Sequence, residues 1–269
     1  MVFEQISELK WLKNKPLIVF GLAILYSALG VISAIAIFPK NADVMTIAFV
    51  SILILPLLNQ MIETEARTVF RKQKLSLSML FKQHIGIFNT YLSFFFGIFM
   101  LFFITAVVLP PDITSQFFSS QLNIYGGVGF ATKTSLSFNQ IAMNNIKVVL
   151  VTFILSLVYG AGSVIILSWN AYVWGIMTGF LLREGLAVAH HNMLLFAALA
   201  LLPILPSLLT ESAGYLLAAI SGGVLSKATL QERLMSKRFN YILTDALMIL
   251  TVAIILIFVG ACIEVRLFG

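Results

Sequence analysis

The chain has 269 residues, of which 60% are hydrophobic and only 10% are charged. A soluble domain carries roughly 25% charged residues, so the composition excludes a soluble globular protein and predicts an all-α protein that crosses a membrane several times. The net charge of +6 does not indicate nucleic-acid binding, because the Lys and Arg residues cluster between apolar stretches and no recognition motif accompanies them. The lone cysteine, Cys262, allows no disulfide within the chain and no cysteine-based metal cage.

The N-terminal part predicts two spans. Residues 1–16 are expected to form a short amphipathic helix on the cytoplasmic side, and an apolar run over residues 17–38 follows it. This run is longer than the apolar region of a signal peptide, so we expect an uncleaved first span. The second span covers residues 44–62, and Pro56 within it predicts a kink because proline removes a backbone hydrogen bond.

Residues 63–84 carry five Lys or Arg residues and two Glu residues, with apolar residues between them. This pattern fits a basic helix that lies on the inner leaflet, and a solvated cytosolic linker is an equal alternative. A Phe-rich third span follows over residues 85–109. Residues 110–143 begin with two prolines and form the longest polar stretch, which we predict to be an external loop.

Asn144 and Asn145 begin the predicted fourth span, and an asparagine is expected to be its N-cap. The span runs to residue 169 and contains Gly160, whose small neighbours favour close helix packing. Asn170 then interrupts the apolar character. The following apolar piece, residues 171–182, holds a GxxxG pair, Gly175 and Gly179, but is too short to cross a membrane comfortably. We therefore expect a broken or re-entrant helix around Asn170.

Residues 193–226 are too long for one crossing, so we expect a second break near residues 203–207, at Pro203–Ser207. Glu211 follows the break and is expected in the first turn of a new helix, where a carboxylate can bond exposed N–H groups. Gly214 and Gly222 continue the helix at close-packing spacing. The final span, residues 240–262, carries Asp245 one turn in, and Glu264 follows its far end.

Parity limits the topology. The chain is inside after the fourth span, and the basic segment 227–238 is also expected inside, so an even number of crossings lies between them. Either residues 171–182 dip back and 193–226 cross twice, or each stretch crosses once. Both alternatives give seven crossings, with the N-terminus in the cytoplasm and the C-terminus outside the cell membrane. They differ in the side that holds His190 and His191.

The segments 144–179 and 206–223, followed by a last span ending in IEV (263–265), resemble the stage II sporulation protein M family, most of all its archaeal branch. The resemblance covers about residues 140–265 and implies a family-like core over 144–265 within a single transmembrane domain, 1–269. The positions at which this chain carries the family's features are Asn145, Gly160, Asn170, Glu211, Gly222 and Glu264.

Two departures limit what the resemblance implies. Ser207 and Leu208 stand where the family has His-Gly, and Thr210 stands where proline or a hydrophobic residue is common. A role that depends on that histidine, such as proton transfer or metal binding, is therefore not expected here. In sporulating bacteria the resemblance implies a membrane scaffold that holds a peptidoglycan-remodelling complex at the division septum.

The candidate residues admit few chemical roles. Glu211 is interpreted as a structural anchor, with a proton or substrate carrier as the alternative. His190 and His191 are adjacent, so they point apart on a helix, and no second metal-ligating motif supports them. We expect no cofactor, no metal site and no catalytic residue, because the chain has no phosphate-binding loop, dinucleotide motif or Ser-His-Asp arrangement.

The leading hypothesis is a non-enzymatic scaffold or partner-binding subunit of an assembly that remodels the membrane or envelope. The runner-up is a permease-like transporter or channel with a site at Glu211 and Asn170, since broken helices line such sites. The expected partners are the lipid bilayer and other membrane or envelope proteins. A homo-oligomer stays open as a further expectation.

Overall fold

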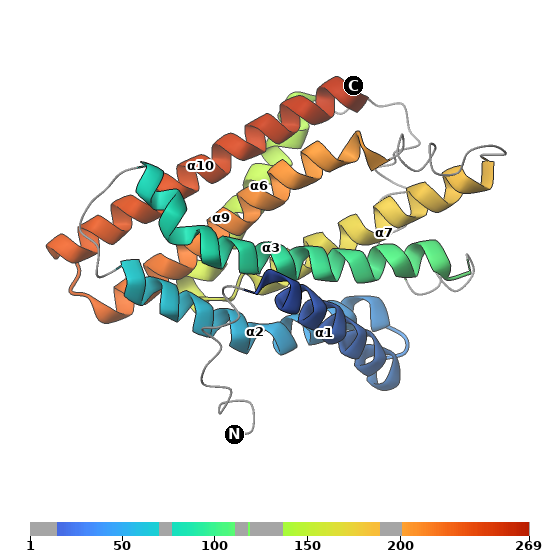
Figure 1. Cartoon of the computed structure of the whole chain (residues 1–269), viewed down its shortest axis with the longest axis horizontal. Helices are drawn as coiled ribbons and strands as arrows, with labels where there is room; N and C mark the ends of the chain where they lie inside the picture. Colours follow the sequence, from blue (N-terminus) through green and yellow to red (C-terminus); the bar gives the residue numbers. More distant parts are fainter. Residues whose placement is uncertain (1–14, 70–76, 111–117, 119–136, 189–200, 269) are drawn as a thin grey trace.

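A computed structural model describes residues 15–69, 77–110, 118, 137–188 and 201–268. Within these residues it contains seven α-helices and no strand (Figure 1). They are α1 (Pro16–Ile37), α2 (Ala42–Val69), α3 (Leu77–Val108), α6 (Phe138–Tyr159), α7 (Val164–Val188), α9 (Ile204–Gln231) and α10 (Lys237–Phe268). Each is long and apolar enough to cross a membrane. The all-α fold with about seven spans is therefore confirmed.

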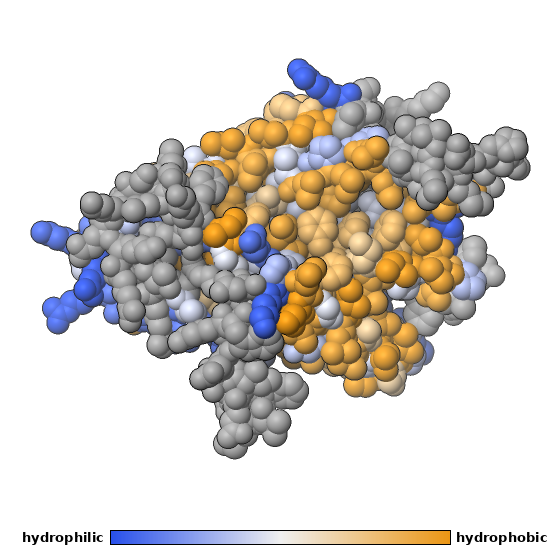
Figure 2. All heavy atoms as spheres, viewed as in Figure 1, coloured by the Kyte–Doolittle hydropathy of each residue, from blue (hydrophilic) through white to orange (hydrophobic). Residues whose placement is uncertain are grey.

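The surface of the bundle is apolar. Figure 2 shows hydrophobic residues covering much of the coloured face, with hydrophilic side chains projecting at the left end and at the upper edge. Large exposed apolar side chains lie on the outer helices, among them Leu25, Ile32, Ile154, Val158, Ile255 and Val259. Such a surface is unfavourable in water and suits contact with lipid chains.

Helix α7 runs parallel to α3. A Cβ atom added at Gly175 would lie 2.5 Å from the Phe99 carbonyl oxygen, and one added at Gly179 would lie 2.7 Å from the Phe103 carbonyl oxygen. The later glycine of α7 thus faces the later residue of α3, as in parallel helices. The GxxxG pair therefore serves close packing. Because α3 and α7 point the same way, an odd number of crossings must lie between them along the chain, and α6 is that single crossing within the described residues.

Helix α9 occupies the centre of the bundle and contacts α2, α3, α6, α7 and α10. It runs parallel to α6, because Tyr215 contacts Asn145 whereas Gly222, further along α9, contacts Ser156, further along α6. All its residues from 214 to 226 are buried. Without a hydrophobic drive between helices in lipid, this central position depends on close packing and polar contacts.

Helix α10 is antiparallel to α9. Gly214 faces Ala253 of α10, and Ser221, seven residues later, donates a hydrogen bond to the Ala246 carbonyl oxygen over 2.6 Å. The relative directions of α3 and α7, and of α6, α9 and α10, are those that seven alternating crossings require.

The break expected at Asn170 is wrong. Helix α7 continues through Asn170, whose side-chain amide donates to the Ile166 carbonyl oxygen of its own helix over 2.7 Å. The chain turns earlier, at residues 160–163, where Gly160 ends α6 with a φ of +67°. Glycine reaches positive φ without a steric penalty, which explains why the turn occurs at this residue. The fourth span ends at Tyr159, and residues 171–182 cross the bundle as part of α7.

The asparagine N-cap expected at Asn144 and Asn145 is also wrong. Helix α6 begins at Phe138, and Ser137 is its N-cap in a capping box with Gln140, whose side-chain oxygen accepts from the Ser137 backbone N–H over 3.0 Å. The capping box satisfies donors that a helix start leaves free. Six residues assigned to the external loop, 138–143, are therefore helical.

A break near Pro203 is present. Residues 202 and 203 form a turn, and α9 begins at Ile204 with Pro206 in its first turn, where proline costs no intrahelical hydrogen bond.

The expected N-terminal helix lies, apart from residues 15–16, outside the described residues, as do His190 and His191. The basic segment 63–84 is divided between the end of α2 and the beginning of α3, and residues 70–76 lie outside the described part.

Candidate functional site

Four polar side chains meet where α6, α9 and α10 converge. Glu211 of α9 is 3% exposed, and its carboxyl group lies against the side chains of Asn145 on α6 and Glu264 on α10. One turn further along α9, Tyr215 donates a hydrogen bond to the Asn145 side-chain oxygen over 2.8 Å. We call Asn145, Glu211, Tyr215 and Glu264 the Glu211 cluster. It joins three of the candidate residues expected from the sequence.

Two carboxyl groups face each other in this cluster. An isolated carboxylate is costly inside a membrane protein, and two facing carboxyl groups are stable when they share a proton. Asn145 offers an amide beside them, and the Glu211 oxygen Oε1 has no hydrogen-bond partner within the described residues. The arrangement can therefore hold a proton between α9 and α10, or simply tie the two helices together.

Glycines on α10 and α9 make room for the cluster. A Cβ atom added at Gly260 would lie 2.8 Å from the Thr210 hydroxyl oxygen and 3.1 Å from Cγ of Glu211. On α9, a Cβ atom at Gly214 would lie 2.9 Å from Ile257. The Glu211 side chain thus packs directly against the α10 backbone, and sequence reasoning did not identify Gly260 as part of the site.

Glu211 does not lie in the first turn of its helix, contrary to the sequence-based expectation. Helix α9 begins at Ile204, about two turns before Glu211. The proline pair misled the prediction, because Pro206 and Ser207 are already helical and the Ser207 hydroxyl donates to the Ile204 carbonyl oxygen over 3.0 Å. The Glu211 carboxyl group therefore binds neighbouring helices instead of free N–H groups.

Gly222 and Gly160 lie on a second contact between α9 and α6. A Cβ atom added at Gly222 would collide with the Phe153 carbonyl oxygen, and one at Gly223 would lie 3.2 Å from the Gly160 carbonyl oxygen. The turn after α6 is closed by a 2.6 Å hydrogen bond from the Ser156 hydroxyl to that of Ser163. The expected close packing of these small residues is present.

Asp245 forms a separate buried pair. Its Oδ2 atom lies 3.1 Å from Nε2 of His84 on α3, and both side chains are buried. Sequence reasoning listed Asp245 as a candidate residue but did not identify His84 as its partner. A titratable residue at the start of an apolar span was the available signal.

A further polar contact fixes the opposite end of α3. The guanidinium group of Arg183 on α7 donates to the carbonyl oxygens of Ala106, over 3.1 Å, and Leu109, over 3.0 Å, and it lies 4.5 Å from the centre of the Phe180 ring. Carbonyl groups at a helix end lack helical partners. Arg183 thus caps α3 from its parallel neighbour, a role that sequence reasoning missed.

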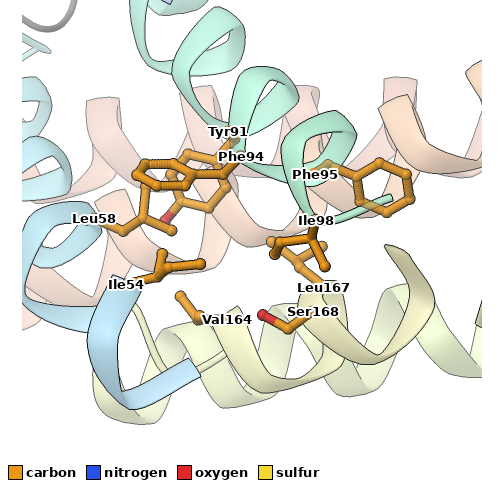
Figure 3. A pocket seen from close by; sticks show the side chains of 9 residues that line it. All are labelled: Ile54, Leu58, Tyr91, Phe94, Phe95, Ile98, Val164, Leu167 and Ser168. Carbon is orange, nitrogen blue, oxygen red and sulfur yellow. The ribbon is translucent and has the colours of Figure 1, made fainter. Parts of the chain in front are cut away.

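A small cavity lies between α2, α3 and α7 (Figure 3). Its volume is about 10 Å³, and its lining residues are Ile54, Leu58, Tyr91, Phe94, Phe95, Ile98, Val164, Leu167 and Ser168. Ligand pockets are typically about 300–1,000 Å³, so the cavity is too small for a substrate. No member of the Glu211 cluster lines it.

The Asn170 side-chain amide donates within α7, and the side chains that bond the Glu211 carboxyl group are those of Glu264 and Asn145. The structure therefore does not assemble the two-residue site expected for a permease. Within the described residues, no group of three or more His, Cys, Asp or Glu side chains is arranged to hold a metal ion, and Cys262 is exposed.

Comparison with known proteins adds one match. The family model described as Stage II sporulation protein M matches residues 90–267. The matched stretch begins in α3 and includes the whole Glu211 cluster, so it is longer than the resemblance seen from the sequence. No significant match is found among curated proteins or among solved structures.

Proposed function

Since the chain belongs to the stage II sporulation protein M family, we propose that it is a non-enzymatic membrane scaffold, a partner-binding subunit of an assembly that remodels the membrane or envelope. The observation that carries the proposal is the enclosure of Glu211. A carboxyl group that carried a substrate or reacted with one would need a path to water or a pocket, whereas Glu211 is 3% exposed and lies between α6 and α10. Its position suits a latch that fixes three helices.

The packing of α9 supports the same reading. Gly214 and Gly222 bring its backbone against α10 and α6, and Tyr215 and Ser221 add polar contacts to each of these helices. A central helix held on two sides gives a rigid bundle, because packed interiors resist continuous deformation. A scaffold needs such a rigid support for its partners.

The orientation of the chain in the cell membrane is part of the proposal. The ends of α2 and α9 lie together, because a Cβ atom added at Gly223 would lie 2.8 Å from Ile62. Arg67, near the end of α2, and Lys227, near the end of α9, therefore belong to one end of the bundle. The positive-inside rule assigns that end to the cytoplasm, so the N-terminus is cytoplasmic and the C-terminus external.

A proton-coupled permease is the second candidate. The observation in its favour is the pair of facing carboxyl groups, Glu211 and Glu264, because acidic side chains within membranes often form proton relays. This candidate needs a water path to Glu211 that opens in another state of the bundle.

Two measurements on the full chain separate the candidates. The tagged protein is purified from its native membranes in mild detergent, as wild type and as Glu211→Gln, which keeps the shape of the side chain. A scaffold is expected to co-purify with a partner in fixed stoichiometry in both forms, and elution of the chain alone counts against it. In proteoliposomes with an enclosed pH dye, proton flux in the wild type that disappears in Glu211→Gln would establish the permease and overturn the scaffold.

A further inference from the structure

The connection between α9 and α10 is a tight turn with an unusual composition. The Ser236 backbone N–H donates to the Arg233 carbonyl oxygen over 3.0 Å, so residues 233–236 form a β-turn with Leu234 and Met235 at its corner. The Ser236 side-chain oxygen accepts from the Phe239 N–H over 3.1 Å and begins α10. The turn is thus well defined, although its two corner residues are large and apolar.

Met235 adopts a backbone conformation that suits glycine. Its φ is 64°, and it is the one non-glycine residue with positive φ in the described part of the chain. Side chains with a Cβ atom are unfavourable in this region. Glycine at this corner would remove the penalty, but the chain places a long apolar side chain there, 87% exposed. The Met235 side chain therefore makes few contacts within the chain that could offset the cost of its backbone conformation.

Two further apolar side chains accompany Met235. Leu234 is 69% exposed and Leu230, in the last turn of α9, is 80% exposed. Exposure of three large apolar side chains to water would be unfavourable. The turn joins two membrane-spanning helices, so it lies at the level of the membrane interface, where such side chains can reach the acyl boundary.

Basic residues surround these side chains. Residues 227–238 contain four basic residues, Lys227, Arg233, Lys237 and Arg238, and one acidic residue, Glu232, which gives a net charge of 4 − 1 = +3. Glu232 lies 3.8 Å from Arg238 and offsets it in part, whereas Arg233 and Lys237 are exposed. Basic charge next to exposed apolar residues is typical of segments that bind anionic membrane surfaces.

We propose that the α9–α10 turn is a membrane anchor for anionic phospholipids. Leu234 and Met235 insert into the acyl boundary of the leaflet, while Arg233, Lys237 and Arg238 bind phosphate groups of the lipids around them. The combination of apolar tip and basic rim selects lipid over a soluble anion, because a free phosphate cannot cover the apolar side chains. The anchor holds the central helix α9 at a fixed depth, independently of whether the chain is a scaffold or a permease.

The first test measures insertion. A nitroxide label is placed at Met235→Cys in a Cys262→Ser background, and the full chain is reconstituted into bilayers of phosphatidylcholine with and without phosphatidylglycerol. Collisions with oxygen, which concentrates in lipid, are expected to exceed collisions with a water-soluble nickel complex. Lys40→Cys, in the exposed turn between α1 and α2, is the water-exposed control. A label at 235 that collides mainly with nickel overturns the proposal, as does a label shielded from both reagents, which would indicate a protein contact.

The second test measures lipid selectivity. Phosphatidylglycerol or phosphatidylcholine is titrated into the purified protein, and bound lipid is counted by native mass spectrometry. Replacement of Arg233, Lys237 and Arg238 by Gln is expected to weaken phosphatidylglycerol binding about fivefold per charge, whereas Lys40→Gln/Lys147→Gln leaves it unchanged. Equal binding of the two lipids, or displacement of phosphatidylglycerol by free glycerol phosphate, would overturn the anchor.

Met235→Gly separates anchoring from folding. The change relieves the positive φ and removes the apolar side chain, so the unfolding midpoint in neutral detergent is expected to stay the same or rise, while phosphatidylglycerol binding falls. A purely structural role for Met235 predicts a lower midpoint with unchanged lipid binding. The two outcomes therefore differ in both measurements.

Discussion

Tyr215 of α9 and Asn145 of α6 are joined by a 2.8 Å hydrogen bond although 70 residues separate them in the chain. Both side chains are buried, and Asn145 also lies against Glu211. The hydroxyl group of Tyr215 thus links α9 directly to α6. This bond connects the family-matched residue Asn145 to a tyrosine that the sequence did not single out.

Removal of the Tyr215 hydroxyl group should weaken the bundle modestly. Tyr215→Phe is expected to lower the free energy of unfolding by about 0.6 kcal/mol, and at most about 1.7 kcal/mol, the range for hydrogen bonds between membrane helices. Asn145→Ala should cost more, because it also removes the neighbour of Glu211. The measurement is unfolding in mixed micelles, with Tyr159→Phe at an exposed position as the control.

A double-mutant cycle tests whether the bond itself is responsible. The double variant is expected to lose less stability than the two single variants added together. Additive losses would show that the two residues act separately.

Close packing at Gly222 gives a larger effect. Gly222→Ala places a Cβ atom against the Phe153 carbonyl oxygen, and such overpacking is expected to cost about 1–3 kcal/mol. Gly21→Ala is the matched control, because a Cβ atom there has nothing within 4 Å. That control should stabilise its helix by about 0.5–1 kcal/mol. Equal effects of the two changes in the same unfolding assay would contradict the packing role of Gly222.

The hydropathy of the sequence was sufficient to predict the helices but not all of their ends. Asn170 looked like a break because it interrupts an apolar run, yet its amide is satisfied by the Ile166 carbonyl oxygen. The chain instead turns at Gly160, between α6 and α7. Several glycines lie nearby, and a single sequence does not tell which of them takes positive φ, because that choice depends on how the following helix packs.

The buried polar residues differed in how readily they could be identified from the sequence. Glu211 stood out because a carboxyl group in an apolar run is costly, and Glu264 and Asn145 were found through the family resemblance. His84 was hidden in a basic segment, and its partner Asp245 lies 161 residues away. Pairing over such a separation is set by helix arrangement, which local pattern does not contain.

The His84–Asp245 pair predicts an asymmetry between single and double variants. Asp245→Ala leaves His84 without its carboxylate in a buried place, and breaking a buried pair is expected to cost about 3–5 kcal/mol. The double change His84→Leu/Asp245→Leu replaces the pair with apolar side chains and should cost clearly less. Unfolding in micelles measures both, with Glu184→Ala at an exposed position as the control. A double variant as unstable as Asp245→Ala would show that the loss comes from the missing pair itself and not from a buried histidine that has lost its carboxylate.

Arg183 should show that its geometry matters as well as its charge. Its guanidinium group reaches two carbonyl oxygens, on Ala106 and Leu109, at 3.1 and 3.0 Å. Arg183→Met removes these bonds, and hydrogen bonds from a charged donor are worth about 1.5–3 kcal/mol. Arg183→Lys keeps the charge but lacks the planar fork that binds two acceptors, so it should recover only part of the loss. Arg266→Met, an exposed arginine on α10, is the control. If Lys restores full stability in the unfolding assay, the contribution of Arg183 is its charge at the end of α3, and the two directed hydrogen bonds are dispensable.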